Sequence, residues 1–176
     1  MPSPLKEKLS SDLKQALKSG DQVRLSVVRM LISGIEYRQI AKRGEIFDKM
    51  QKAGHTELTE ADVKEISAQS EPTDDDVIAV ISREMKQHRE SIEAFRAGNR
   101  PELVDKEEAE LAVLQSYAPQ QMSRPEIMEL SRKIIDETGA RGPRDKGKVM
   151  GKLMPLVRGK ADGQEVNAVV NELLGS

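Results

Sequence analysis

Apolar residues recur three or four positions apart along most of this chain, the spacing that brings side chains onto one face of an α-helix. A first helix is predicted to begin at Ser3-Pro4, since serine caps helices and proline suits the first turn, and to end at Ser19-Gly20. A second is predicted from Asp21 to a stop at Gly44. The two stripes consist of Leu5, Leu9, Leu13 and Leu17, and of Leu25, Val28, Leu31, Ile32 and Ile35.

Two more long helices are predicted in the middle of the chain. One follows Thr73, which forms an acidic version of a capping box with Asp76, and it breaks at 97–99. The other is expected to end by Pro119, because proline cannot continue a helix. Their stripes consist of Ile78, Ile81, Met85, His88, Ile92 and Phe95, and of Leu103, Leu111, Leu114 and Tyr117. Long helices joined by short turns predict an antiparallel bundle.

The segment from about residue 46 to 72 differs from the helices on either side. It is acidic and poor in apolar residues, so we interpret it as an acidic insertion in the bundle. Residues 58–63 have the pattern of a helix start, which favours one short helix, and residues 53–55 are expected to turn.

A smaller second domain is predicted to begin at residue 122. Ser123 and Glu126 have the spacing of a capping box, with a proline inside the first turn. Further helices are predicted over residues 143–157 and from Asp162 onward.

Composition agrees with this pattern. Hydrophobic residues make up 37% of the chain and aromatic residues only 2%, so the core must be built from aliphatic side chains, a mixture suited to helix packing. The sequence therefore predicts an all-α protein: an N-terminal bundle of long antiparallel helices over residues 1–121 and a small three-helix domain over residues 122–176.

The chain contains no cysteine, which excludes disulfides, thiolate zinc sites and cysteine nucleophiles. No segment approaches the roughly 18 uninterrupted apolar residues of a membrane span, and no apolar run follows the first basic residues. From these observations we expect a cytoplasmic protein that does not insert into membranes.

Charge is unevenly distributed. Residues 1–122 carry a net charge of -4 and residues 123–176 one of +2. The segment 141–160 has a single acid, Asp145, and a set of cations that predicts contact with a phosphate-rich partner. These candidate tRNA-binding residues are Arg141, Arg144, Lys146, Lys148, Lys152, Arg158 and Lys160. The alternative, that they are only solvated positions on an exposed helix, stays open.

Other candidate sites give weaker signals. Residues 142–148 match the first seven positions of a phosphate-binding loop, but Val149 replaces the hydroxyl that would bind magnesium, and no strand is predicted before the loop. His88 lies on an apolar stripe and is expected to face the bundle or its rim, and His55 has no evident second ligand. We interpret Glu84, Glu90, Glu107 and Glu110 as surface residues that support the helices. No catalytic residue, metal site or cofactor is predicted.

The C-terminal text, GKVMGKLMPLVRGKADGQEVNAVVNELL from Gly147 to Leu174, resembles the tail domain of GatB, a subunit of the glutamine-dependent aminoacyl-tRNA amidotransferase. The segments LKEKLSSDLKQALKSGDQVRLSVVRMLISGIEYRQIAKRGE and ISREMKQHRESIEAFRAGNRPELVDKEEAELAVLQSYAPQQMS resemble the stand-alone relatives called the YqeY family. The likeness covers nearly the whole chain outside residues 46–72.

The resemblance implies an all-helical protein whose C-terminal domain grips the tRNA body, with Lys148, Arg158 and Lys160 as phosphate contacts. It also implies a family label of carbon-nitrogen ligase activity with glutamine as amide donor. The part of GatB that activates the tRNA-linked carboxylate with ATP has no counterpart here, and neither has the amidase. We therefore do not expect catalysis by this chain alone.

The leading hypothesis is a tRNA-binding accessory protein that contacts the tRNA backbone and recruits an amidotransferase or another protein. A second hypothesis is a helical protein-interaction adaptor that acts through the acidic bundle and the insertion. A glutamine-dependent enzyme is the third, and release of ammonia from glutamine would favour it.

Overall fold

The computed structural model describes residues 3–54 and 58–175, and these residues form α-helices and one short 3-10 helix, with no strand among them. The predicted all-α class is confirmed. The chain divides into two compact units, Met1–Tyr117 and Ala118–Ser176. The turn expected at residues 53–55 lies partly outside the described residues, and His55 lies outside them.

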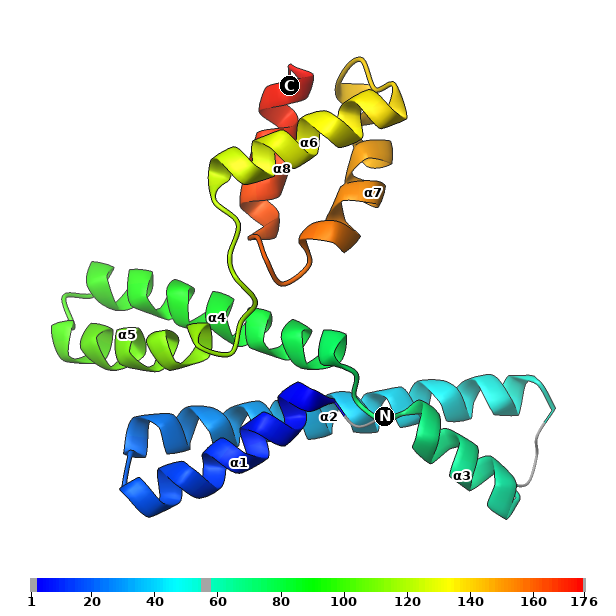
Figure 1. Cartoon of the computed structure of the whole chain (residues 1–176), viewed down its shortest axis with the longest axis vertical. Helices are drawn as coiled ribbons and strands as arrows, with labels where there is room; N and C mark the ends of the chain where they lie inside the picture. The colour runs from blue at the N-terminus through cyan, green and yellow to red at the C-terminus, as the bar shows by residue number, and fades with distance from the viewer. Residues whose placement is uncertain (1–2, 55–57, 176) are drawn as a thin grey trace. The chain divides into compact units, whose positions relative to one another are not determined.

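The N-terminal unit is built from two helical hairpins and one short helix (Figure 1). In the first hairpin, α1 (Pro4–Ser19) packs against α2 (Gln22–Lys52), and in the second, α4 (Asp74–Ala97) packs against α5 (Pro101–Gln115). The long helix α2 contacts both members of the second hairpin. The short helix α3 (Glu60–Gln69) packs beside α2.

Close packing of α2 and α4 depends on a glycine. A Cβ atom added to Gly34 would lie 2.8 Å from Cγ1 of Val80, which is closer than carbon atoms approach. The side chains of Leu31, Ile35 and Ile81 are buried around this contact. The two helices can therefore approach closely because residue 34 has no side chain.

The predicted end of the second helix at Gly44 is wrong, since α2 continues to Lys52. Glycine inside a helix costs about 1 kcal/mol relative to alanine, which weakens a helix without ending it. The second half of α2 contacts α3, and Nε of Arg43, next to Gly44, donates to Oγ of Ser70 at the end of α3 at 3.2 Å, which helps to offset the cost. The short helix predicted after residue 58 is present as α3, capped by Thr59 and Asp62. Whether residues 46–72 are an insertion stays a prediction.

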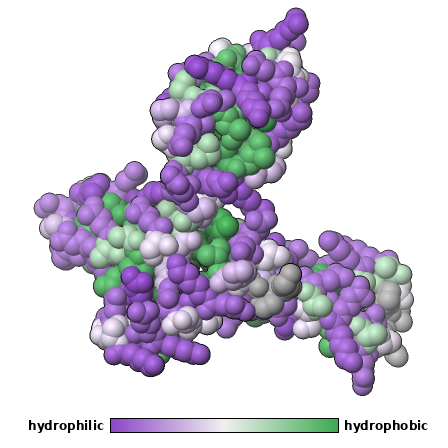
Figure 2. Space-filling view, in the orientation of Figure 1, coloured by the Kyte–Doolittle hydropathy of each residue, from purple (hydrophilic) through white to green (hydrophobic). Residues whose placement is uncertain are grey.

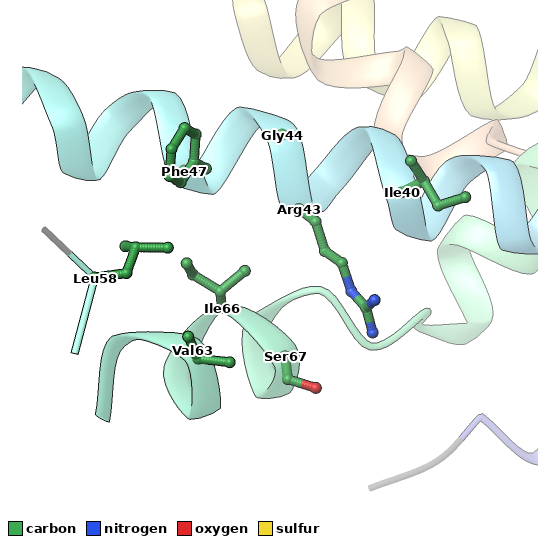
Figure 3. Close-up of a pocket in the computed structure, with 8 residues that line it drawn as sticks. All are labelled: Ile40, Arg43, Gly44, Phe47, Leu58, Val63, Ile66 and Ser67. Carbon is green, nitrogen blue, oxygen red and sulfur yellow. The ribbon is translucent and has the colours of Figure 1, made fainter. Parts of the chain in front are cut away.

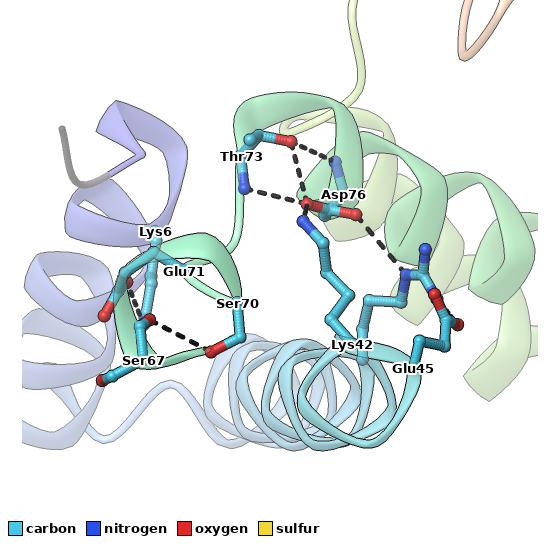
Figure 4. A network of polar contacts seen from close by, with 9 residues as sticks. Lys6, Lys42, Glu45, Ser67, Ser70, Glu71, Thr73 and Asp76 are labelled. Atoms are coloured by element: carbon cyan, nitrogen blue, oxygen red, sulfur yellow. Dashed lines mark hydrogen bonds and ion pairs between the residues drawn. The ribbon is translucent and has the colours of Figure 1, made fainter. Parts of the chain in front are cut away.

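The predicted capping box of Thr73 and Asp76 is also present and joins α4 to α2 (Figure 4). The backbone N–H of Thr73 donates to the Asp76 carboxylate at 3.0 Å. The same carboxylate accepts from Nζ of Lys42 at 2.6 Å and pairs with Nε of Arg38 at 3.4 Å, both from α2. Burial alone would raise the pKa of Asp76, but the hydrogen bonds from Lys42 and Thr73 and the Lys42 charge outweigh burial and hold this pKa well below its ordinary range.

The C-terminal unit contains α6 (Arg124–Thr138), a 3-10 turn η1 (Pro143–Asp145), α7 (Lys146–Val157) and α8 (Gly163–Leu174). The capping box of Ser123 and Glu126 is confirmed. Each of the three α-helices contacts the other two. Their shared core is aliphatic and consists of Ile127, Ile134, Val149, Leu153, Val157, Val166, Val169, Val170 and Leu174. Hydrophilic residues cover most of the visible surface of both units (Figure 2).

None of the helices formed by residues 3–54 and 58–175 has the length and apolarity needed to cross a bilayer.

Replacing Asp76 by Asn is expected to destabilise the N-terminal unit at neutral pH by about 2 kcal/mol, because two α2 cations lose a buried counter-charge. A depressed pKa stabilises the fold above the unfolded-state value of about 4, and this contribution disappears as the pH falls through the folded-state pKa. The difference between wild type and variant should therefore be full at pH 7 and shrink steadily below about pH 4. Urea unfolding across this pH range measures it.

Asp75 is the matched control, since it lies in the same first turn of α4 and is exposed. Asp75→Asn should change the unfolding free energy by less than about 0.5 kcal/mol at either pH. An Asp76→Asn variant with the same pH profile as wild type would contradict the assigned role.

Candidate functional site

Helix α7 carries two exposed lysines beside its buried face. Val149, Leu153 and Val157 are buried in the core of the C-terminal unit. Lys148 and Lys152 are one helical turn apart, and both are exposed. Because residues at i and i+4 share a face, the two side chains leave α7 from the same side. These are the two candidate residues that the helix itself brings together.

The other five candidates lie at the two ends of α7. Arg141 is in the loop after α6, Arg144 is in η1, and Lys146 is the first residue of α7 and half-buried. Arg158 and Lys160 follow the other end and are exposed. A helix of 12 residues is about 18 Å long, so the cations are spread along α7 and its two ends and do not form a single cluster.

None of the seven cations forms an ion pair with a carboxylate in the described part of the chain. The one acid of the segment, Asp145, accepts a hydrogen bond from the backbone N–H of Arg141 at 3.0 Å. Elsewhere cations are commonly paired, as Arg124 is with Glu172 at 2.6 Å. The charge of this segment is therefore not neutralised within the unit.

Lys148 also has a structural role that the sequence did not reveal. Its Nζ donates to the carbonyl oxygen of Thr138 at 2.5 Å. Thr138 is the last residue of α6, where backbone carbonyls lack helical partners and a positive charge is favourable. Lys148 therefore links the start of α7 to the end of α6, whereas no such bond engages Lys152 among the described residues.

Two exposed glycines alternate with these lysines. A Cβ atom added to Gly147 or Gly151 would have no heavy atom of the described chain within 4 Å. Neither glycine is thus required by packing inside the unit, although each weakens α7 by about 1 kcal/mol relative to alanine. Sequence reasoning gave these glycines no role, although the alternation Gly147-Lys148 and Gly151-Lys152 is visible in the text.

The match to a phosphate-binding loop has no structural support. The segment before it is α6 and not a strand, and the pattern itself falls on η1 and the start of α7. Val149, at the position of the hydroxyl residue, is fully buried in the core. This geometry does not form the loop that wraps around a nucleotide phosphate.

The interpretation of the carboxylates as surface residues is wrong in part. Glu90 is exposed and pairs with Lys86 at 3.7 Å, as expected. Glu84 is buried, and its carboxylate accepts two hydrogen bonds from Arg83. The remaining two, Glu107 and Glu110, are largely covered on the side of α5 that faces α4. The reason is that Glu107 and Glu110 lie on the same face of α5 as the buried residues Val104 and Leu114.

His88 faces the interior of the α4–α5 hairpin, as predicted, and is only 7% exposed. Its Nδ1 lies 2.7 Å from a carboxylate oxygen of Glu107 and 3.9 Å from one of Glu110.

A second candidate site is an apolar groove in the N-terminal unit, with a volume of about 510 Å³ (Figure 3). It lies between the second half of α2 and α3. Ile40 is 62% exposed and Val63 54% exposed, which is unusual for aliphatic side chains. The lining residues are Ile40, Arg43, Gly44, Phe47, Leu58, Val63, Ile66 and Ser67.

These features define an all-helical protein with a basic, three-helix C-terminal unit. The family model described as Yqey-like protein matches residues 6–54 and 49–174. The chain therefore belongs to the YqeY family. The two matched ranges together include the whole segment 46–72, which the resemblance noted from the sequence had left out.

Curated relatives share the name "Altered inheritance of mitochondria protein 41, mitochondrial". The protein of Pyrenophora tritici-repentis is 29% identical over 96% of this chain and 80% of its own length. That of Lachancea thermotolerans is 29% identical over 64% of this chain and 46% of its own length. That of Saccharomyces cerevisiae is 24% identical over 73% of this chain, and the match spans 57% of its length.

These names contradict the expected cytoplasmic location, because the relatives are named as mitochondrial proteins. The expectation was based on the absence of cysteine and of apolar segments. Neither property distinguishes one reducing compartment from another.

Replacing Lys148 by Gln is expected to lower the unfolding free energy of the C-terminal unit by about 1 kcal/mol, since the α6 carbonyl loses a charged donor. Lys152→Gln is the matched control on the same face of α7 and should change it by less than about 0.5 kcal/mol. Thermal unfolding of both variants, followed by circular dichroism, measures the difference. Equal stability of the two variants would show that the bond to Thr138 contributes nothing.

Proposed function

We propose that this protein is a tRNA-binding accessory factor whose C-terminal unit contacts the phosphate backbone. The observation that carries the proposal is the set of cations in α7 and at its two ends, none of which has a carboxylate partner in the described chain. A cation that is not neutralised within its own protein is free to replace the counterions of a nucleic acid, and that exchange supplies most of the affinity for phosphate backbones.

The charge of the two units supports the same assignment. The C-terminal unit has a net charge of +2 and the N-terminal unit one of -4, so a polyanion is drawn to the first and repelled by the second. Exposure favours five of the seven cations for phosphate contact besides Lys148, which is engaged with α6, and half-buried Lys146: Arg141, Arg144, Lys152, Arg158 and Lys160. Lys148 can contribute to the local potential while it caps α6.

The kind of nucleic acid follows from the scarcity of aromatic side chains. Proteins that bind single strands stack unpaired bases on aromatic rings. Both tyrosines belong to the N-terminal unit, and the hydroxyl of Tyr117 donates to Asp12 at 2.7 Å. Recognition of a folded RNA by its shape and backbone fits this surface better.

The two exposed glycines favour a close approach. A backbone without a side chain lets a sugar-phosphate chain come nearer to the helix, with a lysine beside each glycine. Gly147 and Gly151 lack neighbours in the described chain that would otherwise explain them.

A direct test is titration of the full chain with total tRNA at 50 mM and 200 mM salt. Neutralising several phosphates makes binding steeply salt-dependent, and an interface of about four contacts loses roughly 100-fold in affinity over this range. The double variant Lys152→Glu and Lys160→Glu should bind at least tenfold more weakly and show a flatter salt dependence. Reversal of Lys86 and Arg96, which lie in the N-terminal unit, should have little effect.

The variant Gly151→Ala separates binding from folding. Alanine should stabilise α7 by about 1 kcal/mol, since it restores helix propensity at an exposed position. If RNA lies against this face, the same variant binds tRNA more weakly although it is more stable. Failure of wild type to bind tRNA at 50 mM salt would remove the proposal.

The proposal includes an amidotransferase only as an enzyme that this protein recruits to tRNA. In this proposal the chemistry belongs to a partner that shares the tRNA.

The apolar groove favours a second candidate function, a protein-interaction adaptor. Val63→Asp adds a charge to the groove wall, and it should abolish capture of a protein partner by the full chain while leaving tRNA affinity unchanged. A partner captured equally by the wild type and by Val63→Asp would exclude the groove as its docking site.

A further inference from the structure

The α4–α5 hairpin contains a cluster of three ionisable side chains that the RNA-binding proposal does not use. It consists of His88 from α4 and of Glu107 and Glu110 from α5. One ligand atom from each residue lies within 4.8 Å of the other two. We propose that this cluster binds a divalent transition-metal ion of the Zn²⁺ class and that the ion fastens α5 to α4.

The position of the cluster is the first argument. On α4, His88 lies on the stripe that includes Ile81 and Ile92, both of which are buried. On α5, the two glutamates lie between Val104 and Leu114, which are also buried. These positions would ordinarily hold aliphatic side chains. Three polar groups that face one another at such positions require a compensating interaction, because burial of charge is unfavourable.

The charge balance is the second argument. The side chain of Glu107 is 18% exposed and that of Glu110 12% exposed, so both carboxylates are largely removed from water. Neither forms an ion pair with a lysine or arginine of the described chain; the partner of both is His88. Even an imidazolium would balance only one of two negative charges. A divalent cation balances both and uses the neutral imidazole as a ligand.

The nearby carboxylate of Glu84 does not alter this balance. Glu84 lies one turn before His88 on α4, but its Oε1 is 2.7 Å from a guanidinium nitrogen of Arg83. It therefore has its own counter-charge. The exposed Glu108 is likewise paired, with Arg96.

The distances agree with a single ion. Around a tetrahedral metal with ligands at about 2.0 Å, neighbouring ligand atoms are about 3.3 Å apart. The Nδ1 atom of His88 is 2.7 Å from Glu107 Oε2 and 3.9 Å from Glu110 Oε2. These distances lie on either side of the ideal value, so small rotations of the glutamates complete the site. A water molecule would supply the fourth ligand.

The mixed ligand set indicates which metal is bound. One imidazole nitrogen and two carboxylate oxygens suit zinc and its neighbours in the first transition row. Magnesium prefers oxygen ligands in octahedral geometry and keeps several waters, so it should compete poorly.

The test is calorimetric titration of the untagged full chain with ZnCl₂, with and without a large excess of Mg²⁺. We expect one ion per chain and little competition by Mg²⁺. Glu110→Gln should weaken the affinity at least tenfold. This variant is expected to fold, because Glu110 makes no hydrogen bond to the described chain and its removal relieves repulsion with Glu107.

Two matched controls define the site. Glu108→Gln changes a neighbouring exposed carboxylate of α5, and His55→Gln removes the other histidine of the chain. Both should bind Zn²⁺ as wild type does. Zinc should also raise the melting temperature of wild type and of both controls but not that of Glu110→Gln.

The alternative is a simple ion pair between His88 and the glutamates. In that case wild type takes up no stoichiometric zinc, and its melting temperature does not respond to the metal. That result would overturn the proposal, as would zinc uptake that survives in Glu110→Gln and is lost in His55→Gln. Either outcome is independent of tRNA binding, which involves the other unit.

Discussion

The N-terminal unit depends on the close approach of α2 and α4. Gly34 has no side chain, so Val80 of α4 can lie where a Cβ atom would otherwise be. Aliphatic side chains on both helices close around this point and exclude water from it. Polar groups at the same interface must then find partners within the protein, as Asp76 does with Lys42 and Arg38.

Much of the fold could be predicted from the sequence because helix periodicity and capping are local signals. The capping boxes at Thr73 and Ser123 gave two helix starts, and α6 follows the second. The end of α2 could not be predicted in the same way. Gly44 has the local signature of a stop, and the packing of α3 against α2, which sustains the helix beyond it, is a contact between segments distant in sequence.

Predictions about the candidate sites were limited for a similar reason. Charge along the sequence identified the cations around α7, but it could not show that Lys148 caps α6. The interpretation of Glu107 and Glu110 as surface residues assumed that charged side chains are exposed to solvent. In a hairpin, the partner helix decides which face of α5 is covered, and α4 covers the face that holds these two glutamates.

One physical criterion separates charges that stabilise this protein from charges available for binding. A buried charge with a partner in the chain, such as Asp76, contributes to the fold, and its removal leaves an uncompensated group behind. An exposed cation without a partner, such as Lys152, costs little in the free protein because water solvates it. Desolvated carboxylates with too little positive charge around them do have a cost, and this is the situation of Glu107 and Glu110. Insufficient counter-charge within the protein therefore points to different ligands at the two sites: an extended polyanion at the solvated surface of α7, and a small cation in the covered interior of the α4–α5 hairpin.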